Sequence, residues 1–265
     1  MVSVLRPGQR ILNIPGIGVS TSRRAVAGGG NGLLNNLIAY WPLNEAAGAN
    51  NALDAHTNGL TLTQVSSPGA DTGKVYATAR TFDGSADYFS RNSETLLQFG
   101  NVDWTIAAWV YLTSKTGDFK PIMSKDNTSA QRELLFQYSV SLDRFRCNVW
   151  NGNTTQRAAV NAEELGSPST STWYLVVAWH DATAGHLGIS ANNTTSTTTS
   201  TSGALGASTA PFRLGTLPAI YFFPGRIGPV AFWKSTAGGG GVLSAAQRTA
   251  LWNAGAGLPY ASFTV

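Results

Sequence analysis

The chain has 265 residues, of which 12% are charged and 43% hydrophobic, and its formal net charge at pH 7 is +4. This balance, with 29 glycines, excludes a disordered chain and disfavours a helical enzyme; it is typical of many short strands joined by polar turns. Much of the basic excess falls near the start, at Arg6, Arg10, Arg23 and Arg24. The remaining body is close to neutral, so we expect no nucleic-acid partner.

The number of cysteines and the distribution of apolar residues further narrow the class of protein. The single cysteine, Cys147, excludes an internal disulfide framework. Arg, Pro and Gly interrupt the apolar residues of the first segment, which therefore does not resemble a signal peptide. No apolar run reaches the roughly 18 residues that a membrane span requires. We therefore expect no membrane insertion.

Residues 1–36 are predicted to form an extended N-terminal docking arm. Pro-Gly pairs separate its short apolar pieces, and a glycine-rich joint, residues 28–32, follows. The segment has too little apolar area to fold alone, but it can add to a neighbour's surface. The alternative is a disordered leader. The candidate docking residues are Arg6, Arg10, Ile11, Ile14, Ile17, Arg23 and Arg24.

Residues 37–265 are predicted to form one β-sandwich domain. Residues 104–112 alternate between a strongly apolar face that begins at Trp104 and a mixed face that carries Trp109 and Tyr111. Such a strand belongs in the middle of a packed sheet. Further strands are predicted before and after it, at residues 37–43, 60–65, 75–82, 121–124 and 133–140.

The second half of the domain continues this pattern. In residues 144–150, Cys147 and its apolar neighbours point inward, while Arg146 and Trp150 point outward. The most hydrophobic strand, residues 172–180, is predicted to be central, and the Thr/Ser-rich run 192–203 is predicted to form an edge strand with a loop. Ser244 is expected to cap one short helix, residues 245–253. The other strands are predicted at residues 155–160, 186–191, 212–215 and 225–233.

Several segments together resemble the laminin-G-like, concanavalin-A-like jelly roll domains, as found in phage virion proteins. Phe82-Asp83-Gly84 with the strand 104–112 resembles that family's central segment. Similar matches occur at residues 38–45, 54–60, 171–177, 223–228 and 243–247. The resemblance implies an all-β, two-sheet jelly roll sandwich, with the extended arm before it and the short helix near its end.

Catalysis is not expected. Many jelly rolls of this shape are glycosidases, which require a pair of carboxylates facing one another across the substrate. The chain has 14 acidic residues, but none form such a pair on a predicted strand. Its three histidines lack metal-ligand spacing with Cys or acids. The sequence therefore predicts a protein that is not an enzyme.

Calcium is the one cofactor that the resemblance suggests. An acidic residue near the first turn often helps to hold Ca²⁺ in laminin-G-like domains, and Asp54 matches that position, with Asp83 or Asp87 as further candidates. The favoured alternative is that Asp54 and Asp83 stabilise turns, because a tight calcium site requires several oxygen ligands.

The sequence also suggests the hypothesis that the sandwich binds glycans. Candidate residues by strand face are Trp150, Arg146, Trp109 and Tyr111, since exposed aromatic and polar side chains are what sugars contact. The alternative is that the eight tryptophans cover the sheets and fill the core.

These observations lead to one preferred function and one alternative. The preferred function is a non-enzymatic structural protein of a tailed phage virion: a capsid decoration, head-fibre or tail-associated protein. Its arm would bind other virion proteins or hold protomers of a homo-oligomer together, and its sandwich would contact host surface glycans. Such a protein is assembled in the host cytoplasm and released by lysis. The alternative is a secreted, extracellular bacterial carbohydrate-binding or adhesion module.

Overall fold

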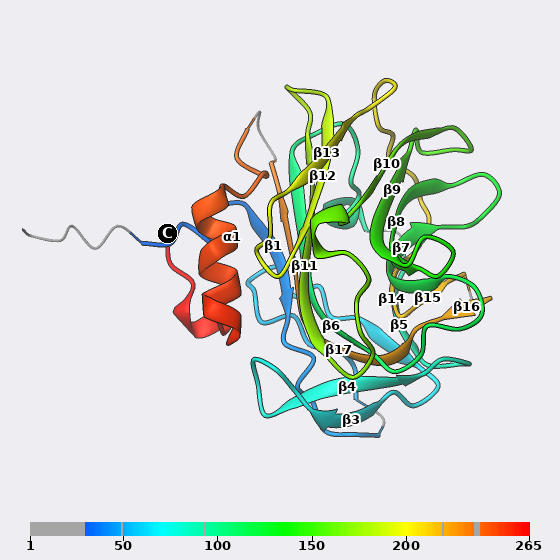
Figure 1. Ribbon diagram of the computed structural model, residues 1–265, viewed down its shortest axis with the longest axis vertical. Helices are drawn as coiled ribbons and strands as arrows, with labels where there is room; N and C mark the ends of the chain where they lie inside the picture. The colour runs from blue at the N-terminus through cyan, green and yellow to red at the C-terminus, as the bar shows by residue number, and fades with distance from the viewer. Residues whose placement is uncertain (1–29, 49, 93, 219, 236–238) are drawn as a thin grey trace, which may run out of the picture.

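The computed structural model describes residues 30–48, 50–92, 94–218, 220–235 and 239–265. Two antiparallel sheets face each other across one large core, and one α-helix packs outside one of them in the described chain (Figure 1). The predicted all-β, two-sheet sandwich with one short C-terminal helix is confirmed.

The eight-stranded sheet forms the layer next to the helix. Its spatial order is β13 (Thr197–Ser200), β12 (His186–Ala191), β11 (Trp173–Asp181), β6 (Trp104–Leu112), β17 (Pro224–Lys234), β4 (Thr78–Asp83) and β3 (Gly69–Thr72), with β1 (Leu37–Trp41) also paired to β17. The Thr/Ser-rich strand β13 lies at the edge, as predicted, and β6 and β11 are both central.

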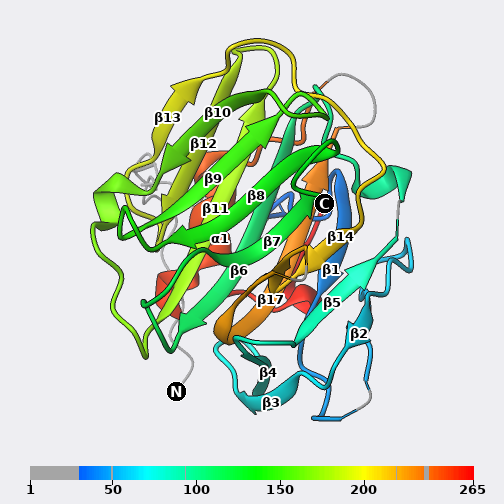
Figure 2. The same ribbon diagram turned by 90° about the vertical axis from the view of Figure 1, so that its right-hand side faces the viewer.

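The seven-stranded sheet forms the opposite layer, and Figure 2 turns it toward the viewer. Its order is β10 (Gln156–Asn161), β9 (Arg144–Trp150), β8 (Arg132–Ser139), β7 (Lys120–Asp126), β14 (Phe212–Leu214), β5 (Tyr88–Arg91) and β2 (Thr63–Val65). A small hairpin, β15 (Thr216–Leu217) with β16 (Tyr221–Phe222), contacts β7 of this sheet. Short 3-10 turns occur at η1 (Thr95–Leu97), η2 (Glu163–Leu165), η3 (Asn253–Gly255) and η4 (Tyr260–Ser262).

Strand β6 carries apolar side chains on both faces, and both faces are covered. The face that begins at Trp104 and Ile106 lies in the main core between the sheets. The other face, with Ala107 and Trp109, packs beneath the C-terminal helix in a second apolar cluster. The central place predicted for this strand is confirmed by its pairing with β11 on one side and β17 on the other.

Helix α1 (Ala245–Trp252) covers the outer face of the eight-stranded sheet. Ser244 caps it: its side chain accepts a hydrogen bond from the Gln247 backbone N–H, and the Gln247 side chain accepts one from the Ser244 backbone. At the other end Asn253 adopts a left-handed conformation, with φ of 46°, so the helix ends there rather than at the glycines that follow. Trp252 stacks on Trp109 at 5.5 Å between ring centroids.

The first described residues belong to the body of the sandwich. Leu33 is fully buried, and its carbonyl accepts a 2.8 Å hydrogen bond from the Trp233 indole. Asn31 and Leu34 bond to Thr264 near the C-terminus. Residues 30–36, which the sequence assigned to the arm, therefore pack against the domain. The predicted docking residues lie outside the described part of the chain: Arg6, Arg10, Ile11, Ile14, Ile17, Arg23 and Arg24.

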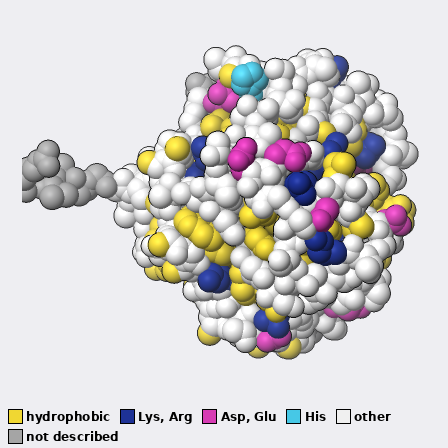
Figure 3. Space-filling model, in the orientation of Figure 1, with side chains coloured by type: hydrophobic (Ala, Val, Ile, Leu, Met, Phe, Trp, Pro, Cys, Tyr) yellow, Lys and Arg dark blue, Asp and Glu magenta, His cyan; other side chains and the backbone are white. Residues whose placement is uncertain are grey.

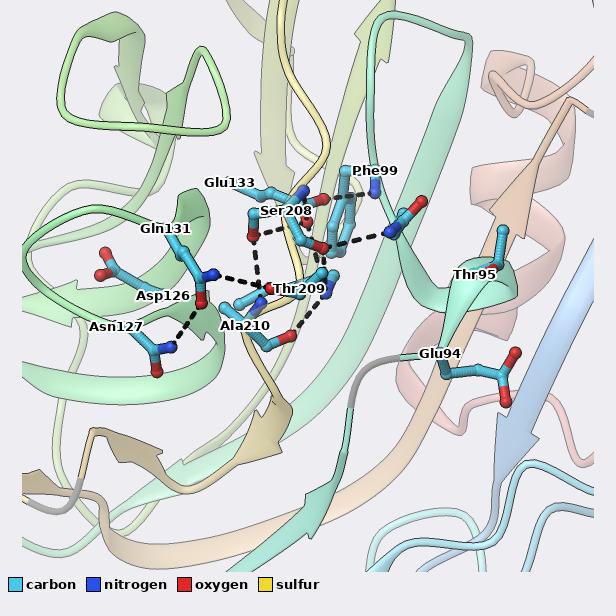
Figure 4. A network of polar contacts seen from close by, with 12 residues as sticks. Glu94, Thr95, Phe99, Asp126, Asn127, Gln131, Glu133, Ser208, Thr209 and Ala210 are labelled. Atoms are coloured by element: carbon cyan, nitrogen blue, oxygen red, sulfur yellow. Dashed lines mark hydrogen bonds and ion pairs between the residues drawn. The ribbon is translucent and has the colours of Figure 1, made fainter.

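A buried ion pair fastens two connections to the seven-stranded sheet (Figure 4). The Lys125 ammonium lies 3.3 Å from the Glu133 carboxylate, and neither side chain is exposed. Lys125 also donates to the carbonyls of Ser208 and Ala210. Glu133 accepts from the backbone N–H groups of Phe99 and Ser208. Burial raises the pKa of the Glu133 carboxyl, while the Lys125 charge opposes that rise.

The outer surface carries charges of both signs. On the face in Figure 3, basic and acidic side chains are intermixed. Among the helices in the described ranges, none combines the length and the apolar character that crossing a bilayer demands.

Candidate functional site

A groove of about 450 Å³ lies on the outer face of the seven-stranded sheet. Strands β8, β9 and β10 form its floor and lie side by side in Figure 2. Its volume falls within the range of small-ligand sites. The groove is lined by Phe119, Arg132, Leu135, Gln137, Ser139, Ser141, Leu142, Arg146, Asn148, Trp150, Gln156 and Leu217.

The alternation of β9 determines which side chains face the groove. Cys147 and its apolar neighbours Phe145 and Val149 lie in the main core, and burial raises the pKa of the Cys147 thiol. The intervening side chains therefore project outward, and Arg146 and Trp150 both line the groove. The alternation predicted for residues 144–150 is confirmed.

The floor of the groove is polar. Arg146 donates from Nε to Asn148 Oδ1 at 2.6 Å and from Nη1 to Asn161 Oδ1 at 2.8 Å. Gln137 is directly opposite Arg146 in the β8–β9 pairing and is only 1% exposed. Its Oε1 is buried without a hydrogen-bond partner. An unpaired buried acceptor costs about 1–3 kcal/mol, so a hydroxyl donor that reached this oxygen from the groove would recover that cost.

Trp150 shapes the groove but is not an open stacking platform. Its side chain is 3% exposed, and the Arg132 guanidinium lies 4.0 Å from its ring centroid. Arg132 is also paired with the buried carboxylate of Asp126, at 2.8 Å. The sequence predicted that Trp150 points outward. It did not predict that Arg132 covers the Trp150 ring, because Arg132 comes from the neighbouring strand.

The wall beside the floor is apolar. Leu217 of the β15–β16 hairpin packs with Leu135 and Trp150, and Tyr221 packs against this cluster. Phe119 contacts Tyr221 edge to face, at 5.2 Å between ring centroids. The hairpin was not predicted, because its two-residue strands are too short for the alternation of side chains to reveal them.

Two of the four predicted glycan-contacting residues lie elsewhere. Trp109 is 3% exposed under α1, on the opposite side of the sandwich from the groove. Tyr111 lies on the same outer face as Trp109, where it packs against Trp173 and beneath Arg226. The structure therefore brings Arg146 and Trp150 together in the groove and leaves Trp109 and Tyr111 with the covered sheet.

The three candidate calcium ligands are occupied by backbone donors. Asp54 accepts hydrogen bonds from three backbone N–H groups, among them that of Leu60 at 2.8 Å. Burial opposes the ionisation of Asp83, but hydrogen bonds from Ser85 and the next two residues outweigh it and hold the pKa of the carboxyl below its ordinary value. Asp87 accepts from two backbone N–H groups.

This arrangement does not fit a calcium ion. A tight site requires six to eight oxygen ligands, whereas these carboxylates already accept hydrogen bonds from backbone N–H groups within and beside their turns. In the part of the chain that the structure describes, no three His, Cys, Asp or Glu side chains form a group able to hold a metal. The contacts match the turn-stabilising interpretation of Asp54 and Asp83.

The sequence was compared with profiles of known protein families. The profile described as the concanavalin A-like lectin/glucanases superfamily matches residues 83–238, which is more than half of the chain. The chain belongs to this superfamily. The matched span includes the groove strands β8, β9 and β10. A search of curated proteins finds no match.

Solved structures of similar shape share the fold of the superfamily. Domain 4 of AbnA, an extracellular arabinanase from Geobacillus stearothermophilus in complex with arabinotriose, is 16% identical, with a TM-score of 0.58 over 81% of this chain and 97% of that chain. The binding domain of Paraclostridial Mosquitocidal Protein 1 is 10% identical, with a TM-score of 0.56 over 76% and 48%. A Trypanosoma rangeli sialidase in complex with sialic acid is 12% identical, with a TM-score of 0.54 over 84% and 34%. At these identities the likeness concerns the fold alone.

Proposed function

We propose that this protein is a non-enzymatic component of a tailed phage virion and that it binds host surface glycans in the groove of the seven-stranded sheet. The observation that carries the glycan-binding part is the groove itself. It combines a polar floor, built around Gln137, Asn148 and Arg146, with an apolar rim.

The chemistry of the groove suits a sugar. Sugar rings present hydroxyl groups at their edges and C–H groups on their faces, so a matching site needs fixed donors and acceptors beside apolar surface. The unpartnered Gln137 Oε1 supplies an acceptor. Phe119 and Leu142 supply exposed apolar surface at the rim, 40% and 45% exposed. Among the similar structures, the arabinanase domain is in complex with arabinotriose.

The lining of the groove supports binding without catalysis. Its residues include no Asp or Glu, whereas most glycosidases place two carboxylates across the scissile bond. The nearby acids have other partners. Asp126 is buried against Arg132, and Glu163 pairs with Arg144 at 3.3 Å.

The place where the chain enters the sandwich supports a protein that is attached to a particle by its N-terminal arm and exposes its groove to the outside. Residues 30–34 lie next to the C-terminal segment, on the α1 side of the molecule and away from the seven-stranded sheet (Figure 1). Anchoring through residues 1–29 would therefore leave the groove on the far side. The basic, Pro/Gly-punctuated composition of the arm and the resemblance to domains of phage virion proteins motivate the virion assignment.

Filling the groove is expected to abolish glycan binding. Ser141 lies exposed in the β8–β9 turn and lines the groove, so Ser141→Trp adds a large ring inside it without disturbing the core. We expect at least a tenfold loss of affinity, because the ring occupies the volume that the sugar needs. Glycan-array binding followed by isothermal titration measures the effect.

Thr183→Trp is the matched control. Thr183 is exposed in the β11–β12 turn, on the other sheet. Its substitution adds the same ring outside the groove and should leave affinity unchanged. Equal binding by both variants would place the sugar elsewhere, and no binding by the unaltered protein to any glycan would reject the proposal.

Removing residues 1–29 is expected to abolish association with the particle while leaving the sandwich folded. The truncated chain keeps the buried Leu33 and the bonds from Asn31 to Thr264. Full-length and truncated proteins are mixed with phage particles assembled without this protein and then sedimented. Sedimentation of the full-length protein alone supports the virion role. If neither protein sediments but both bind glycan, the secreted-module alternative is favoured.

A further inference from the structure

The groove contains a positive charge that the described part of the protein does not neutralise. Arg146 has no carboxylate within ion-pair distance among the described residues, and it is held by the neutral amides of Asn148 and Asn161. Two other arginines nearby differ from it. Arg132 pairs with Asp126, and Arg144 pairs with Glu163. Arg146 is therefore fixed in position without a direct ion-pair partner within the described ranges, because the Glu163 carboxylate accepts from the Asn161 amide instead.

The two amides use only part of the guanidinium. Nε and Nη1 donate to the asparagine oxygens, which leaves Nη2, with two N–H groups, outside these bonds. An arginine already held in one geometry loses little side-chain entropy when it binds a further acceptor. Because a guanidinium presents its donors in a plane, the matching groups are a carboxylate or a sulfate.

The neighbours of Arg146 indicate that the anion is carried by a sugar. Gln137, opposite Arg146 on β8, offers the unpartnered Oε1 as an acceptor, and a hydroxyl donates to such an atom whereas a bare anion cannot. The groove has no acidic lining residue to repel a negative charge. Phe119 and Leu142 add exposed apolar surface beside it.

We propose that the groove selects an acidic glycan, with Arg146 binding the carboxylate or sulfate of one sugar and Gln137 accepting a hydroxyl hydrogen bond from the same chain. This inference rests on the proposed glycan-binding function and narrows it to a class of ligand. Charge-assisted hydrogen bonds provide the selection, because a neutral sugar leaves Arg146 without an anionic partner.

The probes are polygalacturonate, its carboxyl-reduced neutral form and dextran sulfate, titrated against the full-length protein. We expect binding to at least one acidic polymer and about 10- to 100-fold weaker binding to the neutral polymer. Raising the salt concentration is expected to weaken the acidic complex, because it screens the charge. Polygalacturonate binding identifies a carboxylate as the partner, and dextran sulfate binding identifies a sulfate.

Arg146→Gln is expected to weaken acidic-polymer binding by about 10- to 100-fold, whereas the control Arg144→Gln is expected to change it less than about twofold, since Arg144 pairs at a largely exposed site. Both residues lie on β9 and both variants retain the basic arm, so their difference reports the groove alone. Thermal unfolding checks that each variant is folded, and the polymer comparison on the unaltered protein requires no variant.

Three results would overturn the inference, and they differ from one another. Equal binding of the acidic and neutral polymers would reject charge selection but leave the glycan-binding function intact. Failure of every polymer and every arrayed glycan to bind would reject the function and this inference together. Equal loss in Arg146→Gln and Arg144→Gln would also reject the role of Arg146.

Discussion

Replacing Glu133 with alanine is expected to lower the free energy of unfolding by about 3–5 kcal/mol. The substitution leaves the Lys125 ammonium fully buried without its counter-charge. It also removes the acceptor of two backbone N–H groups, those of Phe99 and Ser208. Urea unfolding followed by tryptophan fluorescence measures the change, with an unaltered slope showing that the folded state is still compact.

The reciprocal variant removes the other half of the pair, together with the Lys125 donors to the carbonyls of Ser208 and Ala210. Lys125→Met is expected to cost less than Glu133→Ala, because Glu133 keeps its donors from Phe99 and Ser208. Glu163→Ala is the surface control. It breaks the exposed pair with Arg144, which is worth at most about 1 kcal/mol. Equal losses for Glu133→Ala and Glu163→Ala would show that the buried pair does not hold the connections.

This ion pair marks a limit of prediction from sequence. Lys125 and Glu133 lie at or beside the strands predicted at residues 121–124 and 133–140. Their hydrogen-bond partners, however, are backbone groups near residues 99 and 208–210. Those segments are far apart in the sequence and carry no repeating pattern. The alternation of side chains predicts which residues leave the core; it does not predict which loop crosses above them.

The same limit explains the mixed outcome for the candidate site. Arg146 and Trp150 alternate out of the core on one strand, and both reach the groove. Trp109 also alternates out of the main core, but α1 covers that side of the sheet. Nothing in the sequence of a single strand indicates whether its outer face meets solvent or a helix. Gln137 was missed for a related reason, since a lone glutamine on a strand resembles an ordinary solvent-facing residue.

Part of the family resemblance does have a direct physical cause. The motif at residues 223–228 places Gly225 in β17, between β4 and β6, where Gly225 pairs with Phe82 on one side and Leu112 on the other. Its φ is 135°, a conformation that L-residues with a side chain rarely adopt. A Cβ atom at this position would collide with the backbone carbonyl oxygen of Tyr111. The glycine is needed because backbone, rather than a movable side chain, occupies the space.

Gly225→Ala is therefore expected to destabilise the protein by more than about 4 kcal/mol, at the extreme of single substitutions. The collision involves two central strands that cannot separate without breaking the pairing of β17 with β6. Gly166→Ala provides the comparison. Gly166 also has a positive φ, 72°, with a ψ of −150°, a backbone region that is essentially restricted to glycine, but an added Cβ meets no atom within 4 Å, so only the backbone strain of about 1–3 kcal/mol is expected. Thermal and urea unfolding of both variants measure the difference. Similar losses would show that backbone conformation alone, and not the close approach of β6, requires glycine in this motif.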